Sequence, residues 1–582
     1  MTDWDLTVDA VVVGSGAGAL SGALAARARG LDVLVVEKSD FIGGSTGISG
    51  GMVWIPDNAL MRADGVADSE ADALAYFDAV VGDVGPASSI ERRQAFIREG
   101  NRMIGLWQSL GIPLRRADGY PDYYSDEPGG SVRGRNLEVD LFDIDELGPW
   151  KSKIQAGMFA GLGLIGYSTE LSKMMYFNRS VRALVVAARV QVRTWSAKVR
   201  KKPVVANGGS LVGRLLQSAL GQGAQIWTES AVKELIVDDG AIVGLVVSKN
   251  GKDLRIGARH GVLLAAGGFS YNDDMRGRFG GDKATSSAFS MAAGGDTGEV
   301  LEMAMALGAA TDLMDEAIWV PIMRMPDGSA PPRYKSRTVM AFGRARWRPG
   351  SILVDGSGRR YANESMSYRE LGQLMYARDK QVKAIPSWLL FDDSFRRRCV
   401  FGPVPGRLPE QWIEDGYVKR SHSLAQLAAD CGIDAEQLQS TVLQFNEFAR
   451  TGIDADFHRG ETAYDRYMGD PRTRPNNCLA PIARPPFYAT AIYPGDVGTF
   501  GGLLTDEHAR VLRDGGEPIP GLYAAQHHGL GGWTGLLRRR RKHRPGLRVR
   551  LHRDGTHRRP RCVRARLSAS EPRHRRVVSG SP

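Results

Sequence analysis

Residues 10–38 read AVVVGSGAGALSGALAARARGLDVLVVEK. Val11–Val13 is an apolar run typical of a buried strand, and it leads through the glycine turn GSGAGA into the helical stretch Leu20–Arg29. Gly30 closes that helix, and Leu31–Val36 is a second strand that ends at Glu37. Strand, G-x-G-x-x-A turn, helix, strand and acid thus follow one another in the order of a dinucleotide-binding unit.

Each position of this stretch has a physical reason. Gly14 permits the sharp turn, and Gly16 lets the backbone approach a pyrophosphate. The helix N-terminus offers free N–H groups and a partial positive charge to the phosphates. The carboxylate of Glu37 can accept hydrogen bonds from a ribose diol. The residues predicted to hold the nucleotide here are Gly14, Gly16, Ala17, Gly18 and Glu37.

A second glycine-rich loop follows the acid directly, since residues 38–51 read KSDFIGGSTGISGG. Such a loop can wrap the far side of the pyrophosphate and lead toward a flavin; the alternative is a plain flexible loop. The E-K-x-x-x-x-G-G-S-T arrangement resembles the flavoprotein superfamily of fumarate reductase and succinate dehydrogenase. This resemblance implies FAD as the cofactor. The residues it adds to the cofactor site are Lys38, Gly43, Gly44, Ser45, Thr46, Gly50 and Gly51.

Three later segments agree with that resemblance. Residues 229–247 read as a strand, a turn at Asp238–Gly240 and a returning strand, and in such flavoproteins the residue at Val232 contacts adenine through its backbone. Residues 261–269 read as a buried strand that ends in a glycine turn, which adds Ala266 and Gly267 to the site. Residues 519–525 begin the late strand that returns the chain to the flavin.

The expected fold class is α/β, with a discontinuous, Rossmann-like FAD-binding domain of the GR2 type and an inserted α+β catalytic domain. At 582 residues the chain exceeds what one hydrophobic core usually serves. The expected boundaries are 1–285 and 482–536 for the FAD-binding domain, 286–481 for the catalytic domain, and 537–582 for an aberrant, arginine-rich tail without stable structure.

The segment that would face the substrate is 492–503, IYPGDVGTFGGL. Dicarboxylate enzymes of the superfamily hold their substrate with His and Arg, and this segment contains neither. It resembles instead the P-G-D-x-G-T-x-G-G-L segment of 3-ketosteroid dehydrogenases, which introduce a double bond into ring A of a steroid; Gly502 belongs to it. Residues 351–355 and the run RYANESMSY at 360–368 resemble the same family.

Desaturation beside a ketone removes a proton from the alpha carbon and a hydride from the beta carbon, and FAD accepts the hydride. The resemblance assigns the base role to Tyr368 and a supporting hydrogen bond to Tyr123. A phenol has a reference pKa of about 10, so such a base needs a neighbour that stabilises its anion. Alternatively, both tyrosines are core or interface residues. The choice of Tyr123 over Tyr124 rests on the P-D-Y alignment alone.

Two other functions remain open. One is an FAD-dependent reductase of an activated alkene, which would need an electron donor domain; the chain has no CxxCH haem motif. The other is an inactive flavoprotein remnant. In the dehydrogenase interpretation the partners are a small steroid-like substrate and an unidentified electron acceptor. Neither the four cysteines nor the histidines predict a metal site.

The net charge of +11 is concentrated at the C-terminal end. Residues 537–582 contain sixteen Arg and one Lys against one Asp and one Glu, which is +15 and leaves −4 for the other 536 residues. That run lacks interleaved aromatic residues, so no specific nucleic acid is expected as a partner. The acidic N-terminus lacks a signal, and no run approaches the roughly 18 apolar residues of a membrane span. These features predict a cytoplasmic protein that is not an integral membrane protein.

The sequence after Ala525 departs from the family. The family continues there with G-N and a tyrosine-containing, glycine-rich stretch that opens a helix; this chain has QHHGLGGW, and six of its ten histidines follow residue 525. Gln-His-His can be encoded by CAACACCAC, which one base later reads Asn-Thr. With GC-rich codons, the neighbouring frame of residues 526–553 can spell NTTASAVGRAYYAGAGSIGPGFVFGYIG. We therefore hypothesise a frameshift near codon 526.

Overall fold

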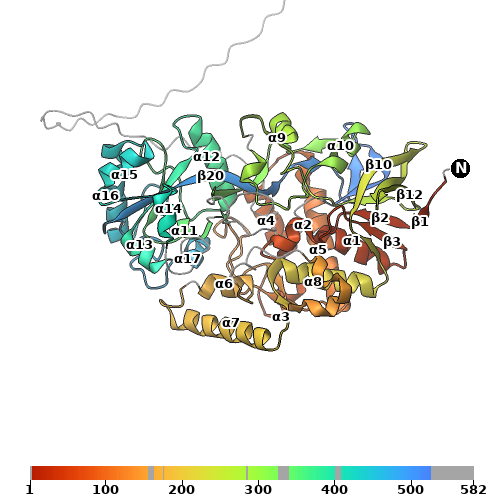
Figure 1. Ribbon diagram of the computed structural model, residues 1–582, viewed down its shortest axis with the longest axis horizontal. Coiled ribbons are helices and arrows are strands. Elements are labelled where there is room, and N and C mark those ends of the chain that lie inside the picture. Colours follow the sequence, from red (N-terminus) through yellow and green to blue (C-terminus); the bar gives the residue numbers. More distant parts are fainter. Residues whose placement is uncertain are drawn as a thin grey trace, which may run out of the picture. The chain divides into compact units, whose positions relative to one another are not determined.

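In the computed structural model, the two valine-rich strands near the N-terminus are inner strands of a six-stranded sheet (Figure 1). Five strands run parallel, and the edge strand pairs antiparallel with its neighbour. The order is β22 (Arg510–Leu512), β23 (Pro518–Ala524), β13 (Val262–Leu264), β2 (Ala10–Val13), β3 (Val33–Val36) and β9 (Gln225–Trp227). The expected late strand is thus confirmed as β23, beside β13.

The structure describes residues 3–154, 163–174, 176–283, 286–324, 340–341, 343–399 and 408–525. All of them belong to one unit, Met1–Arg539. The arginine-rich segment 537–582 and the stretch after Ala525 lie outside the described residues.

Both faces of this sheet are covered, which explains its unbroken valine runs. On one face, Val12, Val33 and Val35 pack in a core with α1 (Ala17–Arg27) and α8 (Asn207–Gly221). On the other face, Val11, Leu34 and Val36 pack against strands of a second sheet. Adjacent residues of one strand therefore enter different cores, as the two-residue period of a strand requires.

The second sheet contains the expected hairpin. Its order is β1 (Leu6–Val8), β12 (Lys252–Ala258), β11 (Ala241–Lys249) and β10 (Ser230–Asp238). At the predicted turn, Asp239 and Gly240 both have positive φ, 46° and 75°, the conformation of a two-residue hairpin turn. The hairpin prediction is confirmed with its turn in the predicted place.

A further six-stranded sheet is built mainly from the later part of the chain. It comprises β16 (Met340–Ala341), β15 (Ala317–Met323), β20 (Phe487–Thr499), β18 (Ser387–Asp392) and β17 (Ser351–Val354), with β19 (Val418–Ser421) also paired to β20. The thirteen-residue strand β20 pairs with β15 along its second half and with β18 along its first. It starts at Phe487, after the predicted boundary at residue 482, and the domain boundaries themselves stay a prediction.

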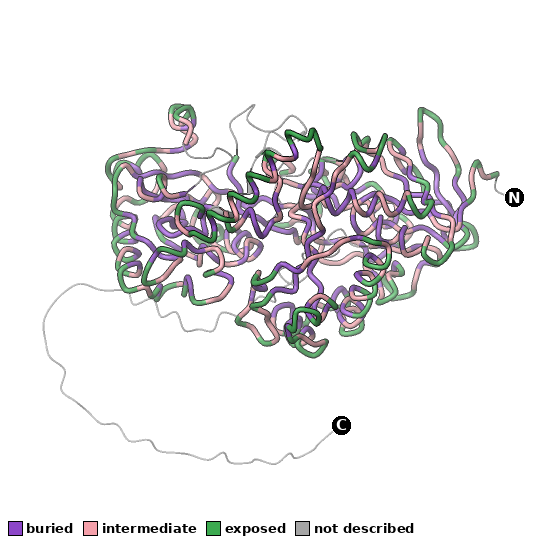
Figure 2. The backbone as a smooth tube through the Cα atoms, turned by 90° about the horizontal axis from the view of Figure 1, so that it is seen from below, coloured by how far each residue is buried: buried purple, intermediate pink, exposed green. Residues whose placement is uncertain are grey.

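This sheet is also covered on both faces. Leu353 and Phe391 enter one core, and Ile352 and Leu390 enter the other. In Figure 2 the buried backbone, in purple, runs inside exposed turns and helix surfaces, in green. Helices around this sheet are α11 (Gly343–Arg346), α12 (Tyr368–Asp379), α13 (Asp393–Arg398), α14 (Glu410–Glu414), α15 (Leu424–Cys431), α16 (Ala435–Thr451) and α17 (Ala463–Met468).

Smaller elements connect these sheets. The short strands are β4 (Met52–Trp54), β5 (Leu114–Arg116), β6 (Asn136–Val139), β7 (Phe142–Asp143), β8 (Val204–Val205), β14 (Thr311–Asp312) and β21 (Gly502–Leu503). The other helices are α2 (Gly44–Ile48), α3 (Ala59–Ala63), α4 (Glu70–Val80), α5 (Ile90–Ser109), α6 (Ser168–Met174), α7 (Val181–Val199), α9 (Asp273–Gly280) and α10 (Glu299–Ala306). Helices α6 and α7 lie along the lower edge of Figure 1.

Candidate active site

The glycine turn after β2 has the geometry that its sequence predicts. Gly14 has a φ of 102°, and a Cβ there would lie 2.3 Å from the carbonyl oxygen of Ala265, so only glycine fits. A Cβ at Gly16 would meet nothing nearer than Thr46 Oγ1 at 3.4 Å. The space at Gly16 and the start of α1, which has no side-chain cap, suit a bound phosphate group.

Glu37 lies directly after β3 and is joined to the turn. Ser15 Oγ donates to Glu37 Oε2 at 2.6 Å and accepts from the Gly43 N–H at 2.9 Å. Burial raises the pKa of the Glu37 carboxyl, while hydrogen bonds from Ser15 and the Ser39 N–H act to lower it. The Glu37 carbonyl accepts from the N–H of Ser230 in β10, which brings the hairpin beside the acid. Val232 lies two residues further along β10.

The second glycine loop folds against the first. Thr46 Oγ1 accepts from the Ala17 N–H at 3.2 Å, and Ser45 Oγ accepts from the Ala293 N–H at 2.9 Å. Lys38 Nζ instead pairs with Glu299 at 2.9 Å, so its charge is engaged with α10. Gly51 has a φ of 66° and no room for a Cβ beside Asn207.

The remaining predicted cofactor residues lie in the same region or at its edge. Gly43 and Gly44 have positive φ at the start of α2, and the Gly50 carbonyl accepts from Ser168 Oγ at 2.9 Å. Ala266 and Gly267 follow β13, the strand between β2 and β23. Gly18 approaches Ala525, because a Cβ at Gly18 would lie 3.5 Å from the Ala525 Cβ. Gly502 begins β21 and pairs with Asp312.

Two tyrosines that are 245 residues apart in sequence meet at their hydroxyl groups. Tyr123 OH donates to Tyr368 OH at 3.2 Å, and their ring centroids are 5.4 Å apart. Tyr124, the alternative in sequence, is buried with Tyr76 and Phe77 in the cluster that Tyr123 packs against, and the hydrogen bond to Tyr368 comes from Tyr123. The geometry therefore favours Tyr123 as the partner of Tyr368.

Tyr123 is held in place by the residue before it. The buried carboxylate of Asp122 accepts from Trp54 Nε1 at 2.8 Å and from the Ser131 N–H at 3.0 Å. It also forms an ion pair with Arg135 at 3.0 Å. Arg135 donates four hydrogen bonds, two to Asp68, one to Asp122 and one to the Gly129 carbonyl, and these bonds fix the loop between β5 and β6. Asp122 is thus an anchor, which sequence reasoning did not identify.

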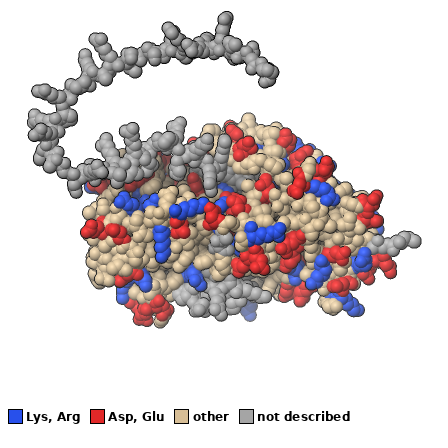
Figure 3. All heavy atoms as spheres, turned by 90° about the horizontal axis from the view of Figure 1, so that it is seen from above, with Lys and Arg blue, Asp and Glu red and all other residues tan. Residues whose placement is uncertain are grey.

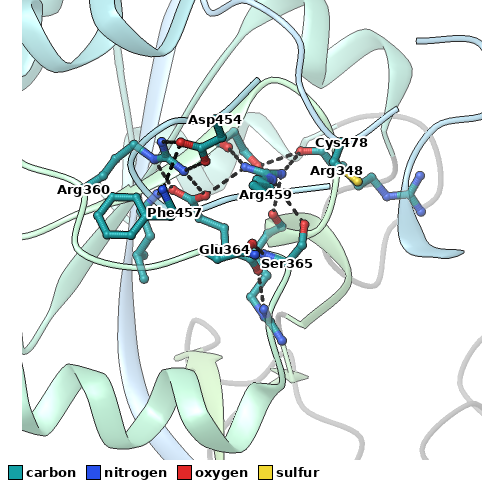
Figure 4. Close-up of polar contacts among 12 residues, drawn as sticks. Arg348, Arg360, Glu364, Ser365, Asp454, Phe457, Arg459 and Cys478 are labelled. Atoms are coloured by element: carbon teal, nitrogen blue, oxygen red, sulfur yellow. Dashed lines mark hydrogen bonds and ion pairs between the residues drawn. The ribbon is translucent and has the colours of Figure 1, made fainter. Parts of the chain in front are cut away.

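Tyr368 begins α12, and a buried ionic network fixes the turn before it (Figure 4). Glu364 pairs with Arg360 at 2.9 Å and with Arg459 at 3.1 Å, and Arg360 also pairs with Asp454 at 2.7 Å. Arg459 further donates to the carbonyls of Ser351, Arg346 and Arg348. Glu364, the acid of the N-E-S run, therefore fixes the backbone that precedes Tyr368.

The electrostatic surroundings distinguish the two tyrosines. Burial raises the pKa of the Tyr368 phenol, whereas the hydrogen bond from Tyr123 and the charge of Arg346 act to lower it. Burial raises the pKa of Tyr123 well above its usual value, and donation to Tyr368 raises it further. Of the pair, Tyr368 is thus the one whose anion receives a hydrogen bond and faces a cation.

That cation is a buried guanidinium. Arg346 Nη1 donates to the carbonyl oxygens of Glu364 and, at 2.8 Å, of Met366, while Nε and Nη2 have no hydrogen-bond partner among the described residues. Burial lowers the pKa of Arg346 to about 10. The guanidinium lies 4.7 Å from the ring centroid of Trp347. Nothing in the sequence marked Arg346 or Arg459, because both act through distant partners.

The segment 492–503 joins the nucleotide-binding turns to the tyrosines. Thr499 Oγ1 accepts from the Phe269 N–H at 3.1 Å, directly after Gly267 and Gly268. The next residue, Phe500, packs in the same cluster as Tyr123. Asp496 is buried and paired with Arg276 at 2.8 Å, so its carboxylate has a structural role. The glycine turn after β13 and the tyrosine pair therefore lie at opposite ends of one short connection.

Three comparisons place the chain among known proteins. A family model described as "FAD binding domain" matches residues 9–526. The 3-oxosteroid 1-dehydrogenase of Mycolicibacterium smegmatis is 38% identical over 89% of this chain and 91% of its own length. The 4-oxocyclohexanecarboxylate 2-dehydrogenase of Sinomonas cyclohexanicum is 35% identical over 89% of this chain and 87% of its own length. A crystal structure of 3-ketosteroid Δ1-dehydrogenase from Sterolibacterium denitrificans with 1,4-androstadiene-3,17-dione is 34% identical, with a TM-score of 0.82 over 91% of this chain and 95% of that one.

The fold and the site define an FAD-dependent oxidoreductase, and the prediction of FAD as cofactor is confirmed. The chain belongs to the family of the 3-oxosteroid 1-dehydrogenases, as its sequence motifs predicted. At the coarser level the fold prediction is also confirmed, since the chain has the FAD-binding flavoprotein fold with mixed helices and sheets. Among the described residues, no helix is both long and apolar enough to cross a bilayer.

Proposed function

We propose that the chain's active site removes two hydrogens from ring A of a 3-ketosteroid. The observation that carries this proposal is the hydroxyl pair of Tyr123 and Tyr368, 3.2 Å apart, next to a segment that reaches the flavin-binding turns. Family membership supports it, because a relative with 34% identity holds a 3-keto steroid product in its crystal structure.

In this proposal Tyr368 is the base. Its phenolate oxygen takes the proton from the carbon alpha to the ketone, and the hydrogen bond from Tyr123 stabilises the phenolate before that transfer. FAD, when bound, accepts a hydride from the beta carbon. Two C–H bonds break and one C=C bond forms, so the two electrons leave with the hydride and the proton stays on Tyr368 O. An unidentified electron acceptor must then reoxidise the flavin.

For the cofactor we propose a Rossmann-like arrangement around β2, α1 and β3. Gly14, Gly16, Ala17 and Gly18 would approach the pyrophosphate, and Glu37 would accept from the ribose diol. The absence of a side-chain cap on α1 and the open space at Gly16 support this role. The proposed catalytic domain is centred on the sheet of β15, β17, β18 and β20.

A second candidate substrate is a smaller cyclic ketone. The 35% identity to a dehydrogenase that acts on 4-oxocyclohexanecarboxylate favours this class, because the same base and hydride acceptor would serve. Reduction of a fumarate-like alkene is a more distant alternative, since the segment 492–503 offers no His or Arg to a dicarboxylate.

The sequence after Ala525 bears on activity. The family model ends at residue 526, at the point where the printed sequence departs from the family. We propose that the printed tail results from a frameshift and that a restored chain, identical through Ala525 and then read in the neighbouring frame, is the active enzyme. Resequencing the gene tests this, because a clean in-frame read of the printed tail contradicts it.

The function itself is tested by anaerobic titration of the flavin-loaded restored chain with androst-4-ene-3,17-dione. Loss of the oxidised flavin absorbance and formation of the 1,4-diene are expected. Bleaching by a 4-oxocyclohexane carboxylate, but not by the steroid, would favour the second candidate. Absence of bleaching by either ketone, in a chain that binds FAD, would rule out both.

A further inference from the structure

The largely buried residue Glu316 contacts both the chain just after β20 and the helix α12. It directly precedes β15, and its side chain is 14% exposed. Its carbonyl oxygen accepts from the Phe500 N–H at 2.8 Å. Its carboxylate accepts from two residues of α12, Arg369 at 3.3 Å and Gln373 at 2.9 Å. One residue therefore joins these two elements through its main chain on one side and its side chain on the other.

Two further donors hold the Glu316 carboxylate. Lys283 Nζ donates to Oε1 at 2.6 Å, and Trp319 Nε1 donates to Oε2 at 3.2 Å. Lys283 belongs to the predicted FAD-binding domain, whereas the other side-chain donors belong to the predicted catalytic domain. Acidic and basic side chains are interspersed over the face shown in Figure 3, but the side chains of Arg369 and Lys283 are only 3% and 10% exposed. The carboxylate is thus fixed from several directions inside the protein.

Each element that Glu316 contacts leads to one side of the reaction. The chain after β20 leads to the flavin side, because the hydroxyl of Thr499 accepts from the Phe269 N–H beside the predicted cofactor turn. Helix α12 leads to the base, because Tyr368 is its first residue. The separation of base and hydride acceptor therefore depends on how these two elements are held together.

Arg369 makes this connection sensitive to the charge of Glu316. Its guanidinium lies 5.9 Å from the Phe500 ring centroid, and its Nε and Nη1 have no hydrogen-bond partner among the described residues. Burial lowers the pKa of Arg369, and the charge of Glu316 acts to raise it. A buried cation that loses its counter-ion is strongly unfavourable. Loss of the carboxylate should therefore displace Arg369 and, with it, the start of α12.

We propose that Glu316 is a positioning residue for the dehydrogenation, which holds the base at the start of α12 at a fixed separation from the flavin-side chain after β20. The inference rests on the proposed function, because it assumes that Tyr368 and the flavin act on one substrate. Glu316 acts through Phe500 and Arg369. Since a misplacement of about 1 Å can cost about 10²-fold in rate, a side chain outside the reacting set can control the chemical step.

The first test measures hydrogen exchange in the full, FAD-loaded chain. E316Q keeps the size of the side chain but removes its charge, so the amides of residues 499–503 and 367–373 should exchange about tenfold faster. The matched control is D315N. Asp315 pairs with the same Lys283 at 2.6 Å, but its side chain is 53% exposed, so this substitution removes an equal charge at the surface. D315N should leave exchange in both segments unchanged.

The second test measures stopped-flow flavin reduction in the restored chain by androst-4-ene-3,17-dione. E316Q should lower the limiting rate about tenfold or more, while the steroid concentration for half-saturation stays unchanged. Deuterium at the beta carbon should slow E316Q by a larger factor than it slows the unsubstituted chain. A loss of folded protein alone would lower the amplitude and leave the limiting rate and the isotope effect unchanged.

R369M removes the same contact from the α12 side. Because the two residues act through one contact, the rate of E316Q/R369M should fall no further than that of the slower single variant. If E316Q does not bind FAD, R369M replaces it under the same criteria, since Glu316 then keeps its contacts with Lys283, Trp319 and Gln373.

The outcomes separate this inference from the proposed function. Equal exchange and equal limiting rates in E316Q and D315N overturn the positioning role while the proposed function stands. Fully additive rate losses in the double variant overturn it as well. If neither ketone bleaches the flavin of the unsubstituted restored chain, the proposed function fails and the positioning role fails with it.

Discussion

At the residue scale, the two tyrosines have unequal surroundings and should differ in effect. Tyr368 receives the hydrogen bond and faces Arg346, whereas Tyr123 donates. In the restored chain, Tyr368→Phe should lower the rate of flavin reduction by about 10²–10⁴-fold, the usual contribution of a general base. Tyr123→Phe should cause a smaller loss, because the base itself remains.

Stopped-flow flavin reduction by a ketosteroid measures both rates. Tyr124→Phe is the control, since the hydrogen bond to Tyr368 comes from Tyr123, and this substitution should leave the rate unchanged. A larger loss for Tyr123→Phe than for Tyr368→Phe would reverse the two roles.

Arg346 should set the pH dependence of the reaction. The base works as a phenolate, so the rate should rise with pH until it passes the pKa of Tyr368, which burial raises. The Arg346 charge opposes that increase, and Tyr123 and Tyr464 are the other titratable groups of the cluster. Arg346→Met should therefore move the midpoint of the rate–pH profile upward.

Arg346→Lys is the matched variant, because it keeps the charge but loses the planar group. In this variant the midpoint of the rate–pH profile should return most of the way to its original pH, while the rate stays somewhat lower. If Arg346→Met lowers the rate equally at every pH, Arg346 acts only by holding the carbonyls of Glu364 and Met366.

At the element scale, substitutions at Gly14 and Gly16 should distinguish an effect on folding from an effect on cofactor binding. Gly14→Ala forces a Cβ within 2.3 Å of a carbonyl oxygen at positive φ, so it should reduce the free energy of unfolding by at least about 2 kcal/mol. Gly16 has a φ of −68° and space for a methyl group, so Gly16→Ala should change stability by less than about 0.5 kcal/mol.

The methyl of Gly16→Ala would instead occupy the path of the pyrophosphate and weaken FAD binding about tenfold or more, which is about 1.4 kcal/mol. Urea unfolding of the FAD-free chain and fluorescence titration with FAD measure the two effects separately. Unchanged FAD affinity in Gly16→Ala would contradict the Rossmann-like arrangement.

The elements that the sequence predicted are those with local signals. The buried valine strands, the hairpin with its Asp239–Gly240 turn and the late strand β23 depend on periodicity and turn chemistry within a few residues. The meeting of Tyr123 and Tyr368 followed from resemblance, because nothing local joins residues so far apart.

What escaped prediction depends on long-range contacts. Asp122 anchors Tyr123 through contacts with Trp54 and Arg135. Arg459 fixes the turn before Tyr368 through its contact with Glu364. Neither role could be found from the spacing of residues in the sequence. The sequence did not predict the strand β20, because Pro494, Gly495 and Gly498 weaken its strand signal.

At the scale of the whole molecule, the decisive question is how the chain continues after Ala525. The Ala525 N–H donates to the Leu264 carbonyl at 2.9 Å, and Ala525 approaches Gly18 at the start of α1. The sequence therefore departs from its family directly beside the nucleotide-binding turn. We therefore expect a change at that point to alter the flavin site even where the first 525 residues are intact.

The resemblance implies that the family's tyrosine-containing stretch after residue 525 donates hydrogen bonds to the 3-keto oxygen, and the given sequence lacks this stretch. A chain with the given tail should consequently reduce its flavin with a ketosteroid at least about 10²-fold more slowly than the restored chain, because removing one oxyanion-type donor alone costs about 10²–10³ in rate. Stopped-flow reduction of both proteins, each saturated with FAD, measures the difference, and FAD titration shows whether binding also weakens. Tyr368→Phe in the restored chain supplies the reference for a lost base. Equal rates for the printed and restored chains would show that residues 1–525 suffice for the chemistry, and the frameshift would then have no consequence for activity.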